Sequence, residues 1–418
     1  MFEKNLIVNN LYVYLAVFSA FFISYIPLVY ILDYISISKN LAYFIFIVLS
    51  FVVILFYIYM ERLQVSKESI VMLVLSLFFA TYAAISHSLT TNYFNDYQTL
   101  IVLSLLNPLY ILQATLLADK KKHIVLFIYG ITSVYFIFVT ILWLKGDLVP
   151  EKDTIFIQVF DVVDAEYYQN VNKYLGLMCI LTLGVFTQRS WLINILKTTL
   201  VVLSIFFMLK IGGRAAIVAL GIVLVFWFLL LRIKLESMYF ILSLVIVIIT
   251  SYVLLLSLDK LIILMQESSI NSINRFANLL MDSDSSHREF LFTKALEQFT
   301  HNSKNLFFGG GMNSFSVFTK EYNIDVYPHN IFLELLAEYG AIGFIIFMLP
   351  VFYLFKIRRE RIGSYVGNDP LNRLFFMIFL YFFIIQMFNG SLRNIWFFTF
   401  ITFLLLPIPK KKPLIVTS

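Results

Sequence analysis

Apolar stretches of about 20 residues recur along the chain, each long enough to cross a bilayer as a helix. Hydrophobic residues make up 61% of the 418 positions, and charged residues only 13%. Such a helix makes all its backbone hydrogen bonds internally, as the hydrocarbon core requires. The sequence therefore predicts an all-α polytopic membrane protein of about 12 transmembrane helices. The expected spans are residues 11–32, 41–60, 69–87, 99–117, 124–144, 174–188, 191–209, 214–231, 237–257, 331–355, 374–389 and 391–408.

The basic residues predict the orientation, because short cytoplasmic connections collect Lys and Arg. With both termini in the cytoplasm, 17 of the 31 basic residues fall in short inner segments. The net charge of +6 is then explained by the membrane topology and does not indicate nucleic-acid binding. No small-residue cleavage site follows the first apolar run, which we interpret as a retained helix. The inner basic residues are Lys4, Arg62, Lys67, Lys120, Lys121, Lys122, Arg189, Arg232, Lys234, Lys356, Arg358, Arg359, Arg361, Arg373, Lys410, Lys411 and Lys412.

Two segments on the predicted outer side, about 145–173 and about 258–328, are long enough to carry function. We interpret 1–418 as a single polytopic domain, with 258–330 as its extracytoplasmic catalytic loop. The lone Cys179 lies within an expected span, so no intramolecular disulfide can form.

A capping box is predicted within the second outer segment. Ser286 stands three residues before Glu289, ahead of an apolar rhythm at Phe290, Leu291, Ala295, Leu296 and Phe299. This pattern predicts a surface amphipathic helix with Arg288 in its first turn. Helix starts attract anions, so Arg288 is a candidate anion ligand. A solvated surface charge is the alternative.

Arg214 is a second candidate for the same chemistry. It follows Gly212 and Gly213 and opens an expected span at the outer face. The two glycines permit a tight turn and the close approach of a ligand to backbone N–H groups. A simple hairpin with an arginine reaching toward the interface is the alternative.

His329 and Asn330 stand at the mouth of the expected span 331–355. His329, Arg214 and Arg288 would then each stand at a helix start on the same side of the membrane. Two guanidinium groups can bind a diphosphate, and their positive charge favours a neutral imidazole that accepts a proton. A capping or interfacial histidine is the alternative.

The same span carries two carboxylates and two glycines. Glu334 and Glu338 are four residues apart and share a face, and carboxylates inside a membrane are usually functional. Gly340 and Gly343 form a small-residue patch that lets another helix approach, so we expect a structural role for them.

Other motifs argue against nucleotide or metal chemistry. Gly309-Gly310-Gly311 allows an unusual backbone turn but lacks the Gly-Lys-Ser/Thr ending of a P-loop. Asp282-Ser283-Asp284 offers two carboxylates with no third ligand, and a solvated acidic turn explains it better. We expect neither a metal nor another cofactor.

Three motifs together resemble the O-antigen ligase and O-antigen (Wzy-type) polymerase family of bacterial membrane proteins. Gly212-Gly213-Arg214-Ala215-Ala216 resembles the family's arginine motif at a helix start. The segment from Ser286 to Phe315 resembles its arginine-to-glycine loop. His329-Asn330, nine residues and Gly340-Ala341-Ile342-Gly343 match its histidine motif without a gap.

The resemblance implies a GT-C-like, metal-independent, inverting glycosyltransferase in the bacterial plasma (inner) membrane. The donor would be an oligosaccharide on undecaprenyl diphosphate, and the acceptor another glycan. Arg214 and Arg288 would bind the diphosphate, and His329 would be the general base. Substrate-binding residues would be Asn330, Glu338, Gly212, Gly213, Gly310 and Arg275.

Polymerase and ligase share these motifs. A polymerase passes the chain to another lipid-linked repeat, whereas a ligase passes it to lipid A-core. The composition, with 45 Phe and 25 Tyr, resembles surface-polysaccharide gene clusters and favours the polymerase. Membrane lipid, a chain-length regulator and a flippase are then expected partners. A transporter or flippase would instead carry charges midway through its spans.

Overall fold

The structure is a computed structural model, and it describes the chain in separate stretches. These are residues 67–89, 121–145, 148–151, 154–157, 167–185, 191–211, 214–232, 285–320, 327–358 and 370–389, with single residues at 48, 52, 55, 107, 108 and 111. Five expected spans (11–32, 41–60, 99–117, 237–257 and 391–408) lie outside the described residues, apart from those single positions.

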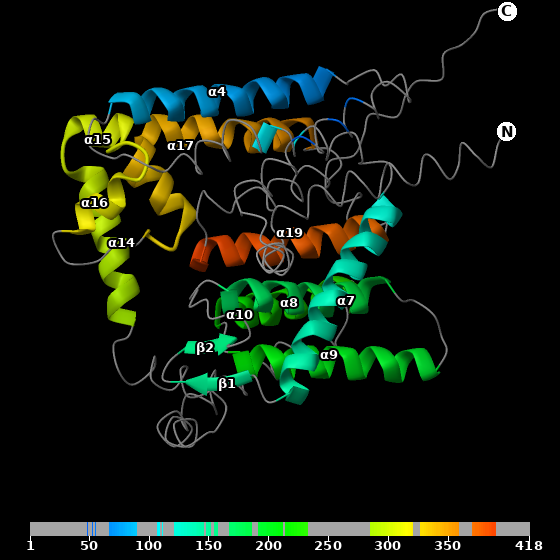
Figure 1. The fold of residues 1–418 in the computed structure, drawn as a ribbon. Helices are drawn as coiled ribbons and strands as arrows, with labels where there is room; N and C mark the ends of the chain where they lie inside the picture. The colour runs from blue at the N-terminus through cyan, green and yellow to red at the C-terminus, as the bar shows by residue number, and fades with distance from the viewer. Residues whose placement is uncertain are drawn as a thin grey trace, which may run out of the picture. The chain divides into compact units, whose positions relative to one another are not determined.

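The other seven expected spans are helices, as predicted (Figure 1). Helix α8 begins seven residues before the expected span 174–188, and α19 begins four residues before 374–389. The bounds are α4 Lys67–Leu89, α7 Lys121–Lys145, α8 Tyr167–Val185, α9 Trp191–Ile211, α10 Arg214–Arg232, α17 Ile331–Arg358 and α19 Pro370–Asn389.

Four helices of the described part are long and apolar enough to cross a membrane. The qualifying segments are Ile124–Ile141, Trp191–Ile211, Ile331–Tyr353 and Pro370–Phe388. Shorter apolar segments occur in α4, α8 and α10 at Ile70–Ser86, Val171–Gly184 and Ala215–Trp227.

Elements that were not predicted lie in both outer segments. In the first, strands β1 (Leu148–Glu151) and β2 (Thr154–Ile157) pair antiparallel as a hairpin. In the second, the predicted amphipathic helix is α14 (Ser285–Thr300), and two short helices follow it, α15 (Ser303–Phe308) and α16 (Ser314–Lys320).

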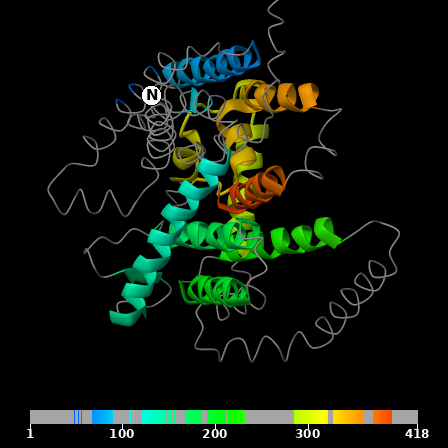
Figure 2. The ribbon, with the colours of Figure 1, turned by 90° about the vertical axis from the view of Figure 1, so that its right-hand side faces the viewer.

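Backbone contacts divide the chain into two compact units. Unit 1 comprises Met1–Ile128, Lys294–Phe379 and Gly390–Ser418, and unit 2 comprises Tyr129–Thr293 and Leu380–Asn389. In unit 1, helices α4 and α17 lie side by side in both Figure 1 and Figure 2. The core between them contains Phe79, Ala83, Met312, Ile331, Leu335, Tyr339 and Ile346.

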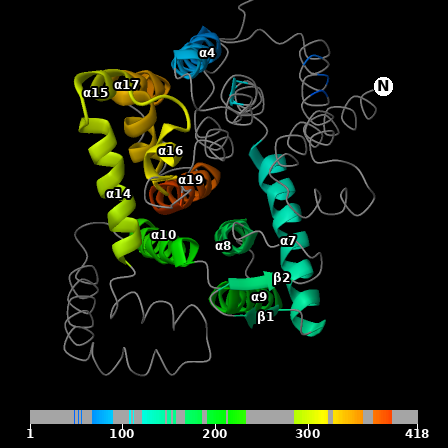
Figure 3. The ribbon, with the colours of Figure 1, turned by 60° about the vertical axis from the view of Figure 1, so that its left-hand side comes forward.

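Unit 2 is built around α8. Figure 3 shows α8 in contact with α9 and α10, with α7 on its other side. The Tyr135 ring of α7 stacks on Tyr174 of α8 at 4.3 Å between centroids. Gly176 lets α8 approach α19 closely, because a Cβ there would collide with the Tyr381 ring. The Tyr381 hydroxyl in turn donates to the carbonyl of Lys173 over 3.1 Å.

Candidate functional site at the start of α17

Asn330 caps the first turn of α17. Its side-chain oxygen accepts hydrogen bonds from the N–H groups of Phe332 (2.9 Å) and Leu333 (3.2 Å). Its own carbonyl accepts the first helical bond, from the N–H of Glu334 over 2.9 Å. This geometry satisfies donors that a helix start otherwise leaves unpaired. The capping residue of this helix is therefore Asn330, and not the neighbouring histidine.

His329 adopts an uncommon backbone conformation directly before that cap. Its φ is 56°, in the left-handed region that non-glycine residues seldom enter. The imidazole lies 4.2 Å from the Tyr327 ring, centroid to centroid, and is partly exposed, whereas Pro328 and Asn330 are buried. A buried residue on each side thus holds a partly exposed histidine at a helix mouth, and such constrained conformations cluster at functional sites.

Helix α17 breaks ten residues after the cap, at Gly340. The φ of 66° and ψ of −173° there are not helical. A break leaves the carbonyls of the three preceding residues without their usual partners four residues ahead. We expected Gly340 to serve helix packing only, and the structure adds this change of direction.

All three carbonyls find partners outside α17. Ala337 accepts from the N–H of Gly310 over 3.0 Å, and Glu338 accepts from the N–H of Gly311 over 2.8 Å. Tyr339 accepts from the Tyr82 hydroxyl of α4 over 2.9 Å. The broken helix is thus completed by a glycine loop and by a neighbouring helix, so no buried carbonyl is left unpaired at the break.

Two glycines make this junction possible. Gly309 and Gly340 both have positive φ, 77° and 66°, and their backbones are in contact. A Cβ on Gly340 would lie 2.5 Å from the Gly309 nitrogen, and a Cβ on Gly309 would collide with the backbone of Glu338. We call Gly309–Gly311 and the Gly340 break the glycine junction. The expected unusual backbone turn of the three glycines is confirmed.

Gly310 and Gly343 have distinct packing roles. The buried Gln298 of α14 donates to the Ser314 hydroxyl over 2.6 Å, and both side chains occupy the space that a Cβ on Gly310 would need. Gly343 faces α4, where a Cβ would meet the Tyr82 ring at 2.7 Å. The predicted close approach of another helix is therefore confirmed at Gly343.

Tyr82 was not identified from the sequence. Besides Tyr339, its hydroxyl lies 3.2 Å from the carbonyl of Phe308 at the end of α15, so one O–H group serves two carbonyls. These partners are 257 and 226 residues away along the chain. No local pattern around Tyr82 could have revealed them.

The two carboxylates of α17 are buried between the cap and the break. Glu334 is 5% exposed and Glu338 is 4% exposed. Burial of a carboxylate is costly unless it has polar partners. Both carboxylates therefore face protein, and a substrate-binding role for Glu338 stays a prediction.

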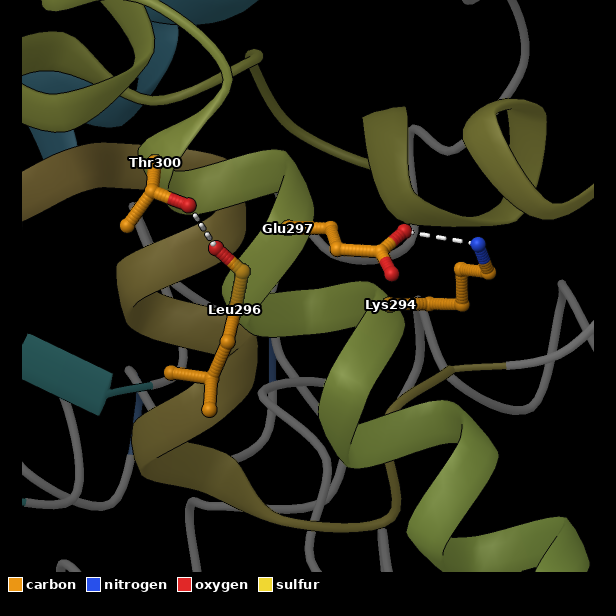
Figure 4. A network of polar contacts seen from close by, with 4 residues as sticks. All are labelled: Lys294, Leu296, Glu297 and Thr300. Carbon is orange, nitrogen blue, oxygen red and sulfur yellow. Dashed lines mark hydrogen bonds and ion pairs between the residues drawn. The ribbon is translucent and has the colours of Figure 1, made fainter.

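Helix α14 is amphipathic, but its buried face differs from the expected one. Leu291, Ala295 and Gln298 are buried, whereas Leu296 is 47% exposed. Figure 4 shows Lys294 and Glu297 of this helix, which form an ion pair of 2.6 Å, and the Thr300 hydroxyl, which donates to the Leu296 carbonyl. The sequence rhythm therefore predicted the helix and placed one leucine on the wrong face.

The predicted diphosphate ligands are described only by their backbone. Arg214 opens α10, and Arg288 lies in the first turn of α14, both as expected. These two residues belong to unit 2 and His329 belongs to unit 1, so the convergence of the three stays a prediction. Gly212, Gly213 and Arg275 lie outside the described residues, as does Asp282-Ser283-Asp284.

These features define an integral membrane protein with a constrained histidine at the mouth of a broken apolar helix. Residues 174–348 match the family model described as O-antigen ligase. This match confirms the resemblance to the O-antigen ligase and polymerase family that was seen in the sequence. The matched stretch contains Arg214, Arg288 and His329. No curated protein matches the chain closely enough to count as a relative.

Proposed function

We propose that the protein polymerises lipid-linked oligosaccharide repeat units on the outer face of the bacterial plasma membrane. The donor is a glycan on undecaprenyl diphosphate, and the acceptor is a second lipid-linked repeat. The family match supports glycosyl transfer from a lipid-linked glycan in general. The product would be an O-antigen, capsule or exopolysaccharide.

The observation that carries this proposal is the geometry of His329. Its side chain is partly exposed, its backbone is held in the left-handed region, and the Asn330 cap fixes the helix that follows. A general base must stand close to the proton that it removes. A rigid helix mouth meets that requirement better than a free loop does.

In the proposed step, an imidazole nitrogen of His329 takes the proton of the acceptor hydroxyl. The acceptor oxygen forms a bond to the anomeric carbon as the bond from that carbon to the diphosphate oxygen breaks, with inversion. Lipid diphosphate leaves, and Arg214 and Arg288 stabilise its charge by bidentate hydrogen bonds. In this proposal no metal takes part.

Ligation to lipid A-core is the second candidate, because the matching family model is named for the ligases. Both reactions use the same donor and the same base, and they differ only in the acceptor. A transporter or flippase is the third candidate and requires no bond formation.

Purified protein in vesicles separates these candidates. With undecaprenyl-diphosphate-linked repeats as the only substrate, a polymerase yields a ladder of lengthened lipid-linked chains. A ligase yields a new product only when lipid A-core is added. A transporter moves the lipid between leaflets and leaves every glycan at its original length, an outcome that would refute the proposal.

A further inference from the structure

Helix α15 combines an exposed apolar end with a tight attachment to two apolar helices. Leu306, Phe307 and Phe308 are 36%, 50% and 52% exposed. The preceding residues His301, Asn302, Ser303 and Lys304 are exposed and polar. The short segment thus changes from polar to apolar along its length.

The apolar end of α15 is fixed at the level of the α17 break. The Phe308 carbonyl accepts from Tyr82, and the backbone of Phe307 lies against Gly340. Gly340 lies where α17 changes direction, so the depth of α15 is judged from the neighbouring helix α4. Tyr82 lies inside the apolar segment Ile70–Ser86 of α4, four residues before its end. The end of α15 is therefore level with the last turns of this apolar segment.

The exposed apolar surface continues from α15 onto α4. Phe78 and Ile85 lie on the same side of α4 as Tyr82, because they are four residues before it and three residues after it. Each is 53% exposed. Apolar surface that continues along membrane-crossing helices is the surface that meets acyl chains.

The backbone beside this surface is satisfied within the protein. The N–H groups of Gly309, Gly310 and Gly311 donate to the carbonyls of Asn305, Ala337 and Glu338. Non-helical backbone is tolerated at membrane depth only where protein supplies such partners. Gly309 and Gly311 are also buried, so acyl chains would meet side chains there and not peptide groups.

We propose that α15 is a re-entrant element. It enters the bilayer from the membrane face at which α17 begins, and Leu306, Phe307 and Phe308 contact the acyl chains of that leaflet. Its polar start, Asn302 to Lys304, stays in the headgroup region or in water. This role does not depend on the reaction that the protein catalyses.

Single nitroxide labels in vesicles test the proposal. Cys179→Ala removes the only native cysteine, and Phe307→Cys or Phe308→Cys then carries the label in phosphatidylcholine vesicles that contain no polyprenyl lipid. Asn302→Cys is the aqueous control, and Ile345→Cys, at a 54% exposed position of α17, is the acyl-chain control. We expect labels at 307 and 308 to collide with oxygen more than with a soluble nickel chelate, as at 345.

Two results would overturn the proposal. Labels at 307 and 308 that behave like the label at 302 would place α15 in water. Labels shielded from both reagents would show that a protein partner or a second copy of the chain covers the surface.

A pair of unlabelled variants keeps the test independent of labelling. Phe307→Asp should lower the Tm in vesicles by several degrees, because a carboxylate replaces a side chain in contact with lipid, whereas Lys304→Asp should leave it unchanged. Equal Tm values for the two variants would contradict the proposed depth of α15.

Discussion

Gly309 and Gly340 touch backbone to backbone, although 30 residues separate them, and this contact holds the broken helix α17 against the loop after α15. Because both have positive φ and neither has room for a Cβ, Gly340→Ala should destabilise the protein by more than about 2 kcal/mol. The measurement is the Tm of purified protein in detergent.

Gly130 of α7 and Gly221 of α10 are the matched controls, since nothing lies within 4 Å of a Cβ at either position. Gly130→Ala should be neutral, or stabilising by about 0.5–1 kcal/mol, through helix propensity. A Gly340→Ala protein as stable as Gly130→Ala would show that the glycine junction is not required.

Tyr82→Phe should weaken the same junction from the side of α4. The change removes the hydroxyl that serves the carbonyls of Tyr339 and Phe308. A buried carbonyl left without a partner costs about 1–3 kcal/mol, which we expect to appear as a lower Tm. Tyr353→Phe, on α17 itself, is the control, because no hydrogen bond of its hydroxyl occurs among the described residues. Equal Tm values for the two variants would mean that the Tyr82 hydroxyl contributes nothing.

The sequence predicted the parts of this arrangement that depend on local chemistry. Bilayer thickness sets the length of apolar runs, so seven spans were located, and the helix starts at Arg214 and near Ser286 agree with the structure. The position of His329 directly before a helix was also predictable, because Pro328 and the apolar run frame it.

Contacts between distant segments could not be predicted. Tyr82 finds its partners more than 200 residues away, and the break at Gly340 is stable only because Gly310 and Gly311 supply N–H groups. The spacing of apolar residues along one helix cannot reveal hydrogen bonds to backbone groups of a distant segment. The burial of Gln298 in place of Leu296 has the same origin, since Ser314 provides its hydrogen-bond partner.

Asn330→Ala should cost about 0.5–2 kcal/mol through loss of the cap on α17. Asn330→Asp keeps a side-chain oxygen for the N–H groups of Phe332 and Leu333, so it should retain the native Tm. Glycan production by the aspartate variant then reports on substrate binding alone. Full activity would show that Asn330 acts only as a cap, whereas a stable but inactive protein would support the predicted role in substrate binding.

Arg214→Ala and Arg288→Ala should each abolish or strongly reduce polymer at normal protein levels, because each removes charge from the proposed diphosphate site. Lysine at either position should restore activity only in part, since a bidentate contact is lost. Normal surface glycan from both alanine variants, expressed at wild-type abundance, would show that the two arginines do not form such a site.

The most direct test of the account is glycan length measured together with protein abundance for His329→Ala and His329→Asn. Loss of a general base costs about 10²–10⁴-fold in rate, enough to erase a ladder and leave single-repeat products. Asparagine tolerates the left-handed backbone of position 329, so His329→Asn should keep the protein in the membrane at its normal level while chain extension is lost. A full-length ladder from His329→Asn would contradict the catalytic assignment.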